Sequence, residues 1–291
     1  MGRKKKQETV ITNNLAVGIL FCLFIAVLLL GSAMLKIFDL VRRSSYDGVH
    51  RYTMAVVDDT TGLEDEIRVV SFSPDTTTIT VLALSELQKQ GDTTRVVTGE
   101  NVGRYLGIPI DAHIVGKNTS LLSYKSDEKK VDTLLENIIW SFRKVSTRLT
   151  ILDVARLYMY TKTMSPSSIR VEELGVGLDD TEIDKLSSEL FVDNEVLAEK
   201  HSIQIINGTA VSGLGNRFAR IVSNMGGNVV SVIGSSEELD NSEIAYTTEE
   251  IPYTAKKLAR VFSIKLTKVQ DTGISDIIVR IGKDKANTNA F

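Results

Sequence analysis

The stretch of this chain best suited to chemistry is a glycine-rich loop, NGTAVSGLG at 207–215, between a predicted strand and a predicted helix. Loops of this kind can hold a phosphate on backbone N–H groups at a helix N-terminus. The candidate binding residues are Asn207, Gly208, Thr209, Gly213 and Gly215. The loop lacks both the G-x-G-x-x-G spacing and the lysine of a P-loop. A tight strand-to-helix turn explains the glycines as well, and we favour that interpretation.

Other reactive side chains form no recognisable constellation. The only cysteine, Cys22, lies in an apolar stretch, so the rest of the chain has no disulfide, thiol nucleophile or cysteine metal site. His50, His113 and His201 are far apart in sequence and have no metal-ligand spacing. No serine has the G-x-S-x-G context of a nucleophile elbow.

The location of the rest of the chain depends on an apolar run from Leu15 to Phe38, in which Lys36 is the only charge. About 20 apolar residues in a helix cross the hydrocarbon core of a bilayer, so this run predicts a transmembrane helix and the lipid bilayer as its partner. The basic tail before it, residues 3–6, favours an N-in orientation. A cleaved signal peptide is the alternative, but its apolar region would be shorter.

The charge of the chain argues against one class of partner. The net charge is −3, and it is more negative without the basic tail. A nucleic-acid-binding domain normally carries a concentrated basic face, so no nucleic-acid partner is expected.

The residues after the anchor predict strands followed by helices. Alternating or β-branched runs at 52–57, 68–73 and 78–84 are typical of strands, and the last two flank a turn at Pro74-Asp75. Apolar spacings of three and four predict further helices. Their ranges are 99–106, 131–145, 152–163 and 180–191.

A second pattern begins near Lys200. Its order is strand, helix, strand, strand, helix, strand, which predicts a four-stranded ferredoxin-like sandwich. The chain as a whole is therefore predicted to be α/β (α+β). Its predicted parts are a cytoplasmic tail at 1–14, a transmembrane helix at 15–38, a juxtamembrane linker at 39–51, a mixed-sheet domain at 52–192, a βαββαβ domain at 200–285 and a disordered tail at 286–291.

The C-terminal unit resembles the C-terminal domain of LytR-type cell-envelope proteins. The resemblance rests on IQIINGTAVSGLGNRFARIVSNMGGNVVSV at 203–232, on IAY and the helix after it at 244–262, and on SDIIVRIGKD at 275–284. It implies a location at the cell wall and a role in binding or interaction.

The block before it looks like a shortened LytR-CpsA-Psr domain. The matching segments are MAVVDD at 54–59, IRVVSFSPDTTTITVLALS at 67–85 and GRYLGIPIDAHI at 103–114. Active members transfer glycopolymers from a polyprenyl pyrophosphate, which arginines grip while carboxylates hold Mg²⁺. The resemblance implies Asp58 and Asp65 as the carboxylates for Mg²⁺, a cation satisfied by one or two carboxylates and substrate phosphates.

This chain lacks the family's arginines at positions where binding of the pyrophosphate would require them. Leu63 stands where the family's Arg-x-Asp-Thr begins, and Glu86 replaces the arginine of Pro-Arg-Asp. Without arginines to bind phosphate oxygens, we favour the simpler interpretation that Asp58-Asp59 and Glu64–Glu66 are polar turn residues.

We therefore expect a membrane-anchored extracytoplasmic protein of a bacterial cytoplasmic membrane. It would be non-catalytic, without a required cofactor, and would bind cell-wall polymer or envelope proteins. The alternative is a divergent Mg²⁺-dependent glycopolymer transferase or pyrophosphatase that uses Asp58 and Asp65. The oligomeric state does not follow from the sequence.

Overall fold

The computed structural model describes residues 2–59, 66–84, 101–117, 131–175, 177–271 and 273–286. These residues belong to two units, Met1–Ser45 and Tyr46–Phe291.

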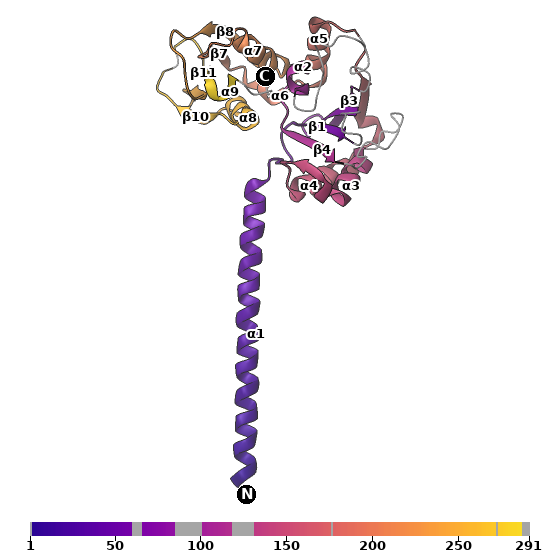
Figure 1. Cartoon of the computed structure of the whole chain (residues 1–291), viewed down its shortest axis with the longest axis vertical. Coiled ribbons are helices and arrows are strands. Elements are labelled where there is room, and N and C mark those ends of the chain that lie inside the picture. Colours follow the sequence, from indigo (N-terminus) through magenta and orange to yellow (C-terminus); the bar gives the residue numbers. More distant parts are fainter. Residues whose placement is uncertain are drawn as a thin grey trace. The chain divides into compact units, whose positions relative to one another are not determined.

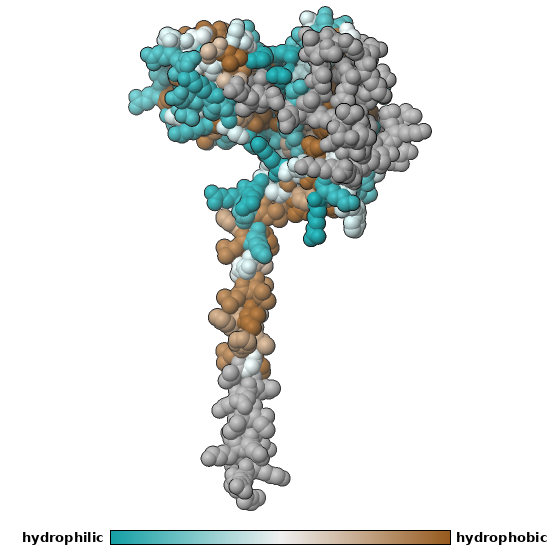
Figure 2. All heavy atoms as spheres, viewed as in Figure 1, coloured by the Kyte–Doolittle hydropathy of each residue, from teal (hydrophilic) through white to brown (hydrophobic). Residues whose placement is uncertain are grey.

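The first unit is one long helix, α1 (Gly2–Arg43). Its stretch Gly18–Arg43 is long and apolar enough to cross a membrane, and none of it is buried against other parts of the protein. The continuous apolar surface is visible as the brown band in Figure 2. Length and composition therefore agree with the predicted span at 15–38, although the helix itself extends beyond both ends of that range.

The second unit begins with a six-stranded mixed sheet (Figure 1). Its strands are β1 (Tyr52–Asp59), β2 (Glu66–Ser73), β3 (Thr78–Ala83), β4 (Ala112–Lys117), β5 (Val145–Thr147) and β6 (Ile169–Glu173), in the order β5-β4-β1-β2-β3-β6. The predicted hairpin is confirmed, because β2 and β3 pair antiparallel. The parallel partners of β1 and β3, which are β4 and β6, were not predicted.

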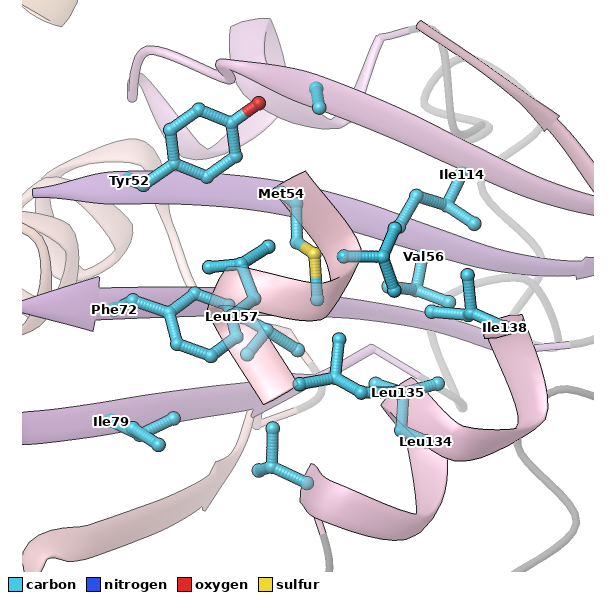
Figure 3. Packing of buried hydrophobic residues seen from close by; sticks show 14 of the residues in the cluster. Tyr52, Met54, Val56, Phe72, Ile79, Ile114, Leu134, Leu135, Ile138 and Leu157 are labelled. Atoms are coloured by element: carbon cyan, nitrogen blue, oxygen red, sulfur yellow. The ribbon is translucent and has the colours of Figure 1, made fainter. Parts of the chain in front are cut away.

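Helices cover both faces of this sheet because its strands are apolar on both sides. The helices are α2 (Val102–Leu106), α3 (Val131–Trp140), α4 (Ile151–Lys162) and α5 (Asp180–Leu190). Helices α3 and α4 pack on the face that carries Met54, Val56 and Phe72 (Figure 3). Helices α2 and α5 pack on the opposite face, against Ala55 and Val57.

Two of the predicted helices begin with a capping box. Asp179 caps α5 by accepting a hydrogen bond from the backbone of Glu182, whose side chain reaches back in a capping box. Thr150 and Asp153 make the same arrangement at the start of α4. Helix α3 is shorter than predicted, because after Trp140 the chain turns into a short 3₁₀ segment (Phe142–Lys144) and strand β5.

The C-terminal part forms a second mixed sheet. Its elements are α6 (Asn194–Glu199), β7 (Ser202–Asn207), α7 (Leu214–Asn224), β8 (Asn228–Gly234), β9 (Glu243–Tyr246), α8 (Tyr253–Phe262), β10 (Lys265–Lys268), β11 (Ile277–Ile281) and α9 (Lys283–Ala286). The strand order is β10-β9-β11-β7-β8. Helices α7 and α8 cover the face that carries Ile203, Ile205 and Val279.

The α/β class is confirmed, but the four-stranded ferredoxin-like arrangement was wrong in detail. The strand β10, whose short sequence KLTK has little apolar alternation, was missed. The two strand–helix–strand units also place their strands side by side: β7 pairs parallel with β8, and β9 with β10. A split βαβ unit would place another strand between them. Here β11 instead enters the centre of the sheet, parallel to β7 and antiparallel to β9.

Candidate functional site

Asp58 lies near the carboxyl end of β1 and is 6% exposed. It is part of the strand and pairs in register with Glu66 of β2 and Gly116 of β4. The favoured interpretation of Asp58-Asp59 as polar turn residues was therefore wrong, because strand β1 lies between two neighbours and continues to Asp59. The second predicted carboxylate, Asp65, lies outside the residues that the structure describes.

A charged residue that the sequence reasoning passed over lies on the same face of the sheet. Arg68 is 5% exposed and pairs in register with Val56, two residues before Asp58. Side chains at such diagonal positions of an antiparallel pair are within reach of long residues. The sequence did contain the signal, since Arg68 shares the alternation of Val70 and Phe72, which point into the core.

The Mg²⁺ hypothesis names Asp58 and Asp65, and the structure describes only the first of them. Within the described parts of the chain, no group of three or more histidine, cysteine, aspartate or glutamate residues could hold a metal ion. Asp58 and Arg68 are buried charged residues on the same face of the sheet. The Mg²⁺ site stays a prediction.

The glycine-rich loop at 207–215 is held together by its own polar groups. The side-chain oxygen of Asn207 accepts hydrogen bonds from the backbone and hydroxyl of Thr209, at 3.1 and 2.7 Å. Its amide donates to the carbonyl of Val211 at 2.9 Å, and the hydroxyl of Thr209 accepts from the backbone N–H of Val211. These side-chain groups are used inside the loop, which supports a structural turn.

The glycines of the loop have steric reasons of their own. A Cβ on Gly208 would lie 2.6 Å from the side chain of Leu239, and a Cβ on Gly215 would lie 3.0 Å from Val232. Gly213 has a φ of +76°, in the left-handed region that favours glycine, and caps α7. Each glycine therefore has a role in folding that needs no ligand.

Among the described residues, a buried group of charges lies between the two sheets. Lys257 of α8 places its ammonium 2.7 Å from the carboxylate of Asp193, and the hydroxyl of Tyr253 donates to the same carboxylate at 2.9 Å. Burial disfavours the ionised form of Asp193 and by itself would raise the pKa of this carboxyl group. The attraction of Lys257 and the hydrogen bonds that the carboxylate accepts outweigh this and hold the pKa of Asp193 below its usual value. Burial, together with the nearby Asp193, raises the pKa of Tyr253.

A second contact joins the sheets on the side of α7. The guanidinium of Arg220 pairs with Asp184 of α5 and donates to the backbone carbonyls of Arg104 and Tyr105, each at 3.1 Å. The amide of Asn224 donates to the same carboxylate at 2.9 Å. Both carbonyls lie at the end of α2, where a helix leaves acceptors without intrahelical partners. The C-terminal part thereby completes the capping of a helix in the first sheet's domain.

The segment Tyr46–Arg51 also contacts both parts. Arg51 donates to the hydroxyl of Ser71 and to the carbonyl of Leu190, while its own carbonyl accepts from Lys257 at 2.9 Å. Beside it, the ring of His50 stacks on Tyr253 with the ring centroids 4.4 Å apart. This segment, predicted only as a polar linker, is a packed element of the interface.

Comparison with known proteins confirms the C-terminal resemblance. Residues 200–284 match the LytR C-terminal domain, described as LytR cell envelope-related transcriptional attenuator. None of the curated proteins matches the chain.

Several solved structures are similar to about half of the chain. TagV of B. subtilis is 16% identical with a TM-score of 0.32, over 48% of this chain and 96% of TagV. The transcriptional regulator yvhJ from Bacillus subtilis is 15% identical with a TM-score of 0.32, over 47% of this chain and 94% of that one. TagT bound to LIIa-WTA is 10% identical with a TM-score of 0.34, over 50% and 92% of the two chains. At these TM-scores the similarities do not by themselves establish the fold of the region.

Proposed function

We propose that this chain, which carries a LytR C-terminal domain at residues 200–284, is a single-pass protein of the bacterial cytoplasmic membrane. It presents two packed domains to the cell envelope and binds cell-wall polymer or envelope proteins without catalysing a reaction. The family match of residues 200–284 is the observation that carries this proposal. The apolar helix α1 supports the anchor, and the basic residues before it support the N-in orientation.

The support for binding without catalysis comes from the sequence. Leu63 and Glu86 stand where the resembled LytR-CpsA-Psr domain carries arginines. A pyrophosphate leaving group needs fixed positive charge, and a glutamate repels it. The ion pairs of Lys257 and Arg220, which join the C-terminal part to the first sheet's helices and connecting segment, suit a scaffold.

Sedimentation with cell-wall sacculi tests this proposal. The full chain in nanodiscs should sediment with purified peptidoglycan, with or without attached teichoic acid, more than a control that joins residues 1–45 to an unrelated soluble protein. Cross-linking in cells should reveal envelope proteins if protein is the partner. Retention no greater than the control, together with no cross-linked envelope protein, would reject the binding role.

One observation favours the enzymatic alternative, a divergent glycopolymer transferase or pyrophosphatase. Asp58 and Arg68 are both buried on the same face near the end of β1, where a carboxylate and a guanidinium could act together on a phosphate substrate. The assay is Mg²⁺-dependent release of phosphate from a polyprenyl pyrophosphate by the full chain, by Asp58→Ala and by Asp65→Ala. Release that falls in both variants would establish the enzyme, whereas equal release in all three would exclude this site.

A further inference from the structure

The pair α3–α4 exposes apolar side chains on the side that faces away from its sheet. Trp140, the only tryptophan of the chain, is 88% exposed at the end of α3. On α4, Ile151 and Met159 are 42% and 66% exposed, and the exposed Ala155 lies between them on the same stripe. The core-facing side of α4 is also apolar, with Val154 fully buried. Helix α4 is thus apolar on two sides, and only one of them is covered by the protein.

Basic residues outnumber acidic ones in the segment that carries this stripe, although Lys162 at its end is paired with Asp132 and Glu136 of α3. From Trp140 to Lys162 the only acidic residue is Asp153, and it is completely buried. The basic residues of the same stretch are Arg143, Lys144, Arg148, Arg156 and Lys162. Residues 44–291 as a whole contain more acidic than basic residues, so the net charge of this stretch is opposite in sign to that of the region around it. An apolar stripe with a basic border is typical of a surface that binds anionic membranes.

The chain connection limits how far helix α4 can lie from the C-terminal end of the proposed membrane anchor. Two serines separate Arg43, the last residue of α1, from Tyr46, and three residues of extended chain span at most about 10 Å. The backbone N–H of Tyr46 donates to Asp153 of α4 at 2.9 Å, and its carbonyl accepts from Arg156 at 3.1 Å. Helix α4 is therefore bound to the first residues that follow the anchor.

We propose that the α3–α4 surface binds the outer face of the bilayer in which the chain is anchored, with anionic phospholipid as its ligand. The surface consists of Trp140, Arg143, Lys144, Arg148, Ile151 and Met159. Tryptophan is enriched at the level of lipid headgroups, where its ring is apolar and its N–H stays hydrated. Arginine and lysine near the surface are attracted to anionic headgroups. This inference rests on the proposed anchoring of the chain.

A second copy of the chain is a less suitable occupant of the same surface. In a symmetric contact between two copies the same patch lies on both sides. Arg143, Lys144 and Arg148 of one copy would then approach those of the other, and like charges would repel. A membrane surface with anionic headgroups compensates the same charges.

The tryptophan fluorescence of the protein reports on Trp140 alone, because the chain has no other tryptophan. The full chain is placed at one copy per nanodisc, in discs of phosphatidylcholine alone or with phosphatidylglycerol. With phosphatidylglycerol we expect a blue shift of the emission, protection from iodide and quenching by brominated lipid. High salt should reverse all three effects. Incorporation into the disc tests the anchor separately, so failure of the anchor and failure of the lipid contact are distinguishable.

Two pairs of variants control the measurement. Arg143→Glu with Lys144→Glu should abolish the bromolipid quenching, whereas Lys256→Glu with Lys265→Glu, at exposed positions of the C-terminal domain, should leave it unchanged. Moving the probe with Trp140→Phe and Ile274→Trp, a position 72% exposed, should give a tryptophan that iodide quenches and bromolipid does not. Emission of Trp140 typical of water in both kinds of disc would overturn the proposal. So would a blue shift without bromolipid quenching, which would indicate a protein contact.

Discussion

The ammonium of Lys257 lies 2.7 Å from the carboxylate of Asp193, and both side chains are at most 3% exposed. Asp193 lies between α5 and α6 and caps α6, whereas Lys257 belongs to α8. The same ammonium donates to the carbonyl of Arg51, next to the first strand. Because a buried charge that loses its partner is costly, the two domains can separate only by exposing this pair to water.

The buried pair predicts a large effect of removing one charge. Lys257→Met leaves the carboxylate of Asp193 buried without its cation, and we expect the free energy of unfolding to fall by about 3–5 kcal/mol. Urea unfolding of the full chain in detergent micelles, followed by circular dichroism, measures it. The neighbouring Lys256 is exposed, so Lys256→Met is the matched control and should change stability by less than about 0.5 kcal/mol. Equal effects of the two substitutions would contradict this account of the interface.

The same pair predicts how stability depends on pH. The pKa of Asp193 is lower in the folded protein than its usual value, so the stabilisation is complete above about pH 4 and is lost as the pH falls through the lower folded pKa. The melting temperatures of the wild type and of Asp193→Asn should therefore differ most near pH 6 and converge below about pH 4. A difference that stays constant down to pH 3 would show that the carboxylate charge does not contribute.

The loop at 207–215 predicts a steric effect at Gly208. A Cβ there would approach the side chain of Leu239 to 2.6 Å, and the backbone carbonyl of Gly208 accepts a hydrogen bond from the same residue. Gly208→Ala should therefore destabilise the protein by about 1–3 kcal/mol through overpacking. Gly234→Ala, where a Cβ meets nothing within 4 Å, is the control and should be close to neutral. Phosphate binding by the wild type that Gly208→Ala abolishes while stability is unchanged would instead support the ligand-binding interpretation.

The connection after the anchor predicts an effect of Asp153. This fully buried carboxylate accepts from the backbone N–H of Tyr46 and from both the backbone and hydroxyl of Thr150. Asp153→Ala breaks the capping box of α4 and leaves these donors without their acceptor, so we expect a loss of about 2 kcal/mol or more. Limited trypsin digestion should then cleave at Arg51 faster than in the wild type. Asp132→Ala, at a partly exposed carboxylate on α3, should digest like the wild type.

Local patterns were sufficient for the elements whose residues alternate or repeat at helical spacing. The β2–β3 turn at Pro74-Asp75 and the capped start of α5 at Asp179 follow from neighbours within a few residues. The strands β4 and β10 were missed because AHIVGK and KLTK are short and only partly apolar, and pairing with β1 and β9 makes them strands. Such pairing is decided by residues distant in sequence.

In the candidate site, too, local sequence predicted some features and long-range pairing decided others. The sequence identified Asp58 as a residue at the end of a strand, but its burial depends on β2 and β4 on either side. Arg68 was passed over although its alternation with Val70 and Phe72 predicts an inward side chain. The loop at Asn207 is a strand-to-helix connection held by hydrogen bonds of its own side chains, and phosphate binding there stays a prediction.

The sequence by itself determined the apolar helix α1, the α/β class and the C-terminal LytR domain, since each rests on composition, periodicity or a contiguous motif. Only the tertiary structure decided that Lys257, Asp193 and Arg51 meet between the two sheets. Their charges are paired by residues that lie more than 60 positions apart, and no local spacing encodes such a distance. The glycine-rich loop that first suggested a binding site is held by its own polar groups, whereas a buried group of charges lies where the two domains join.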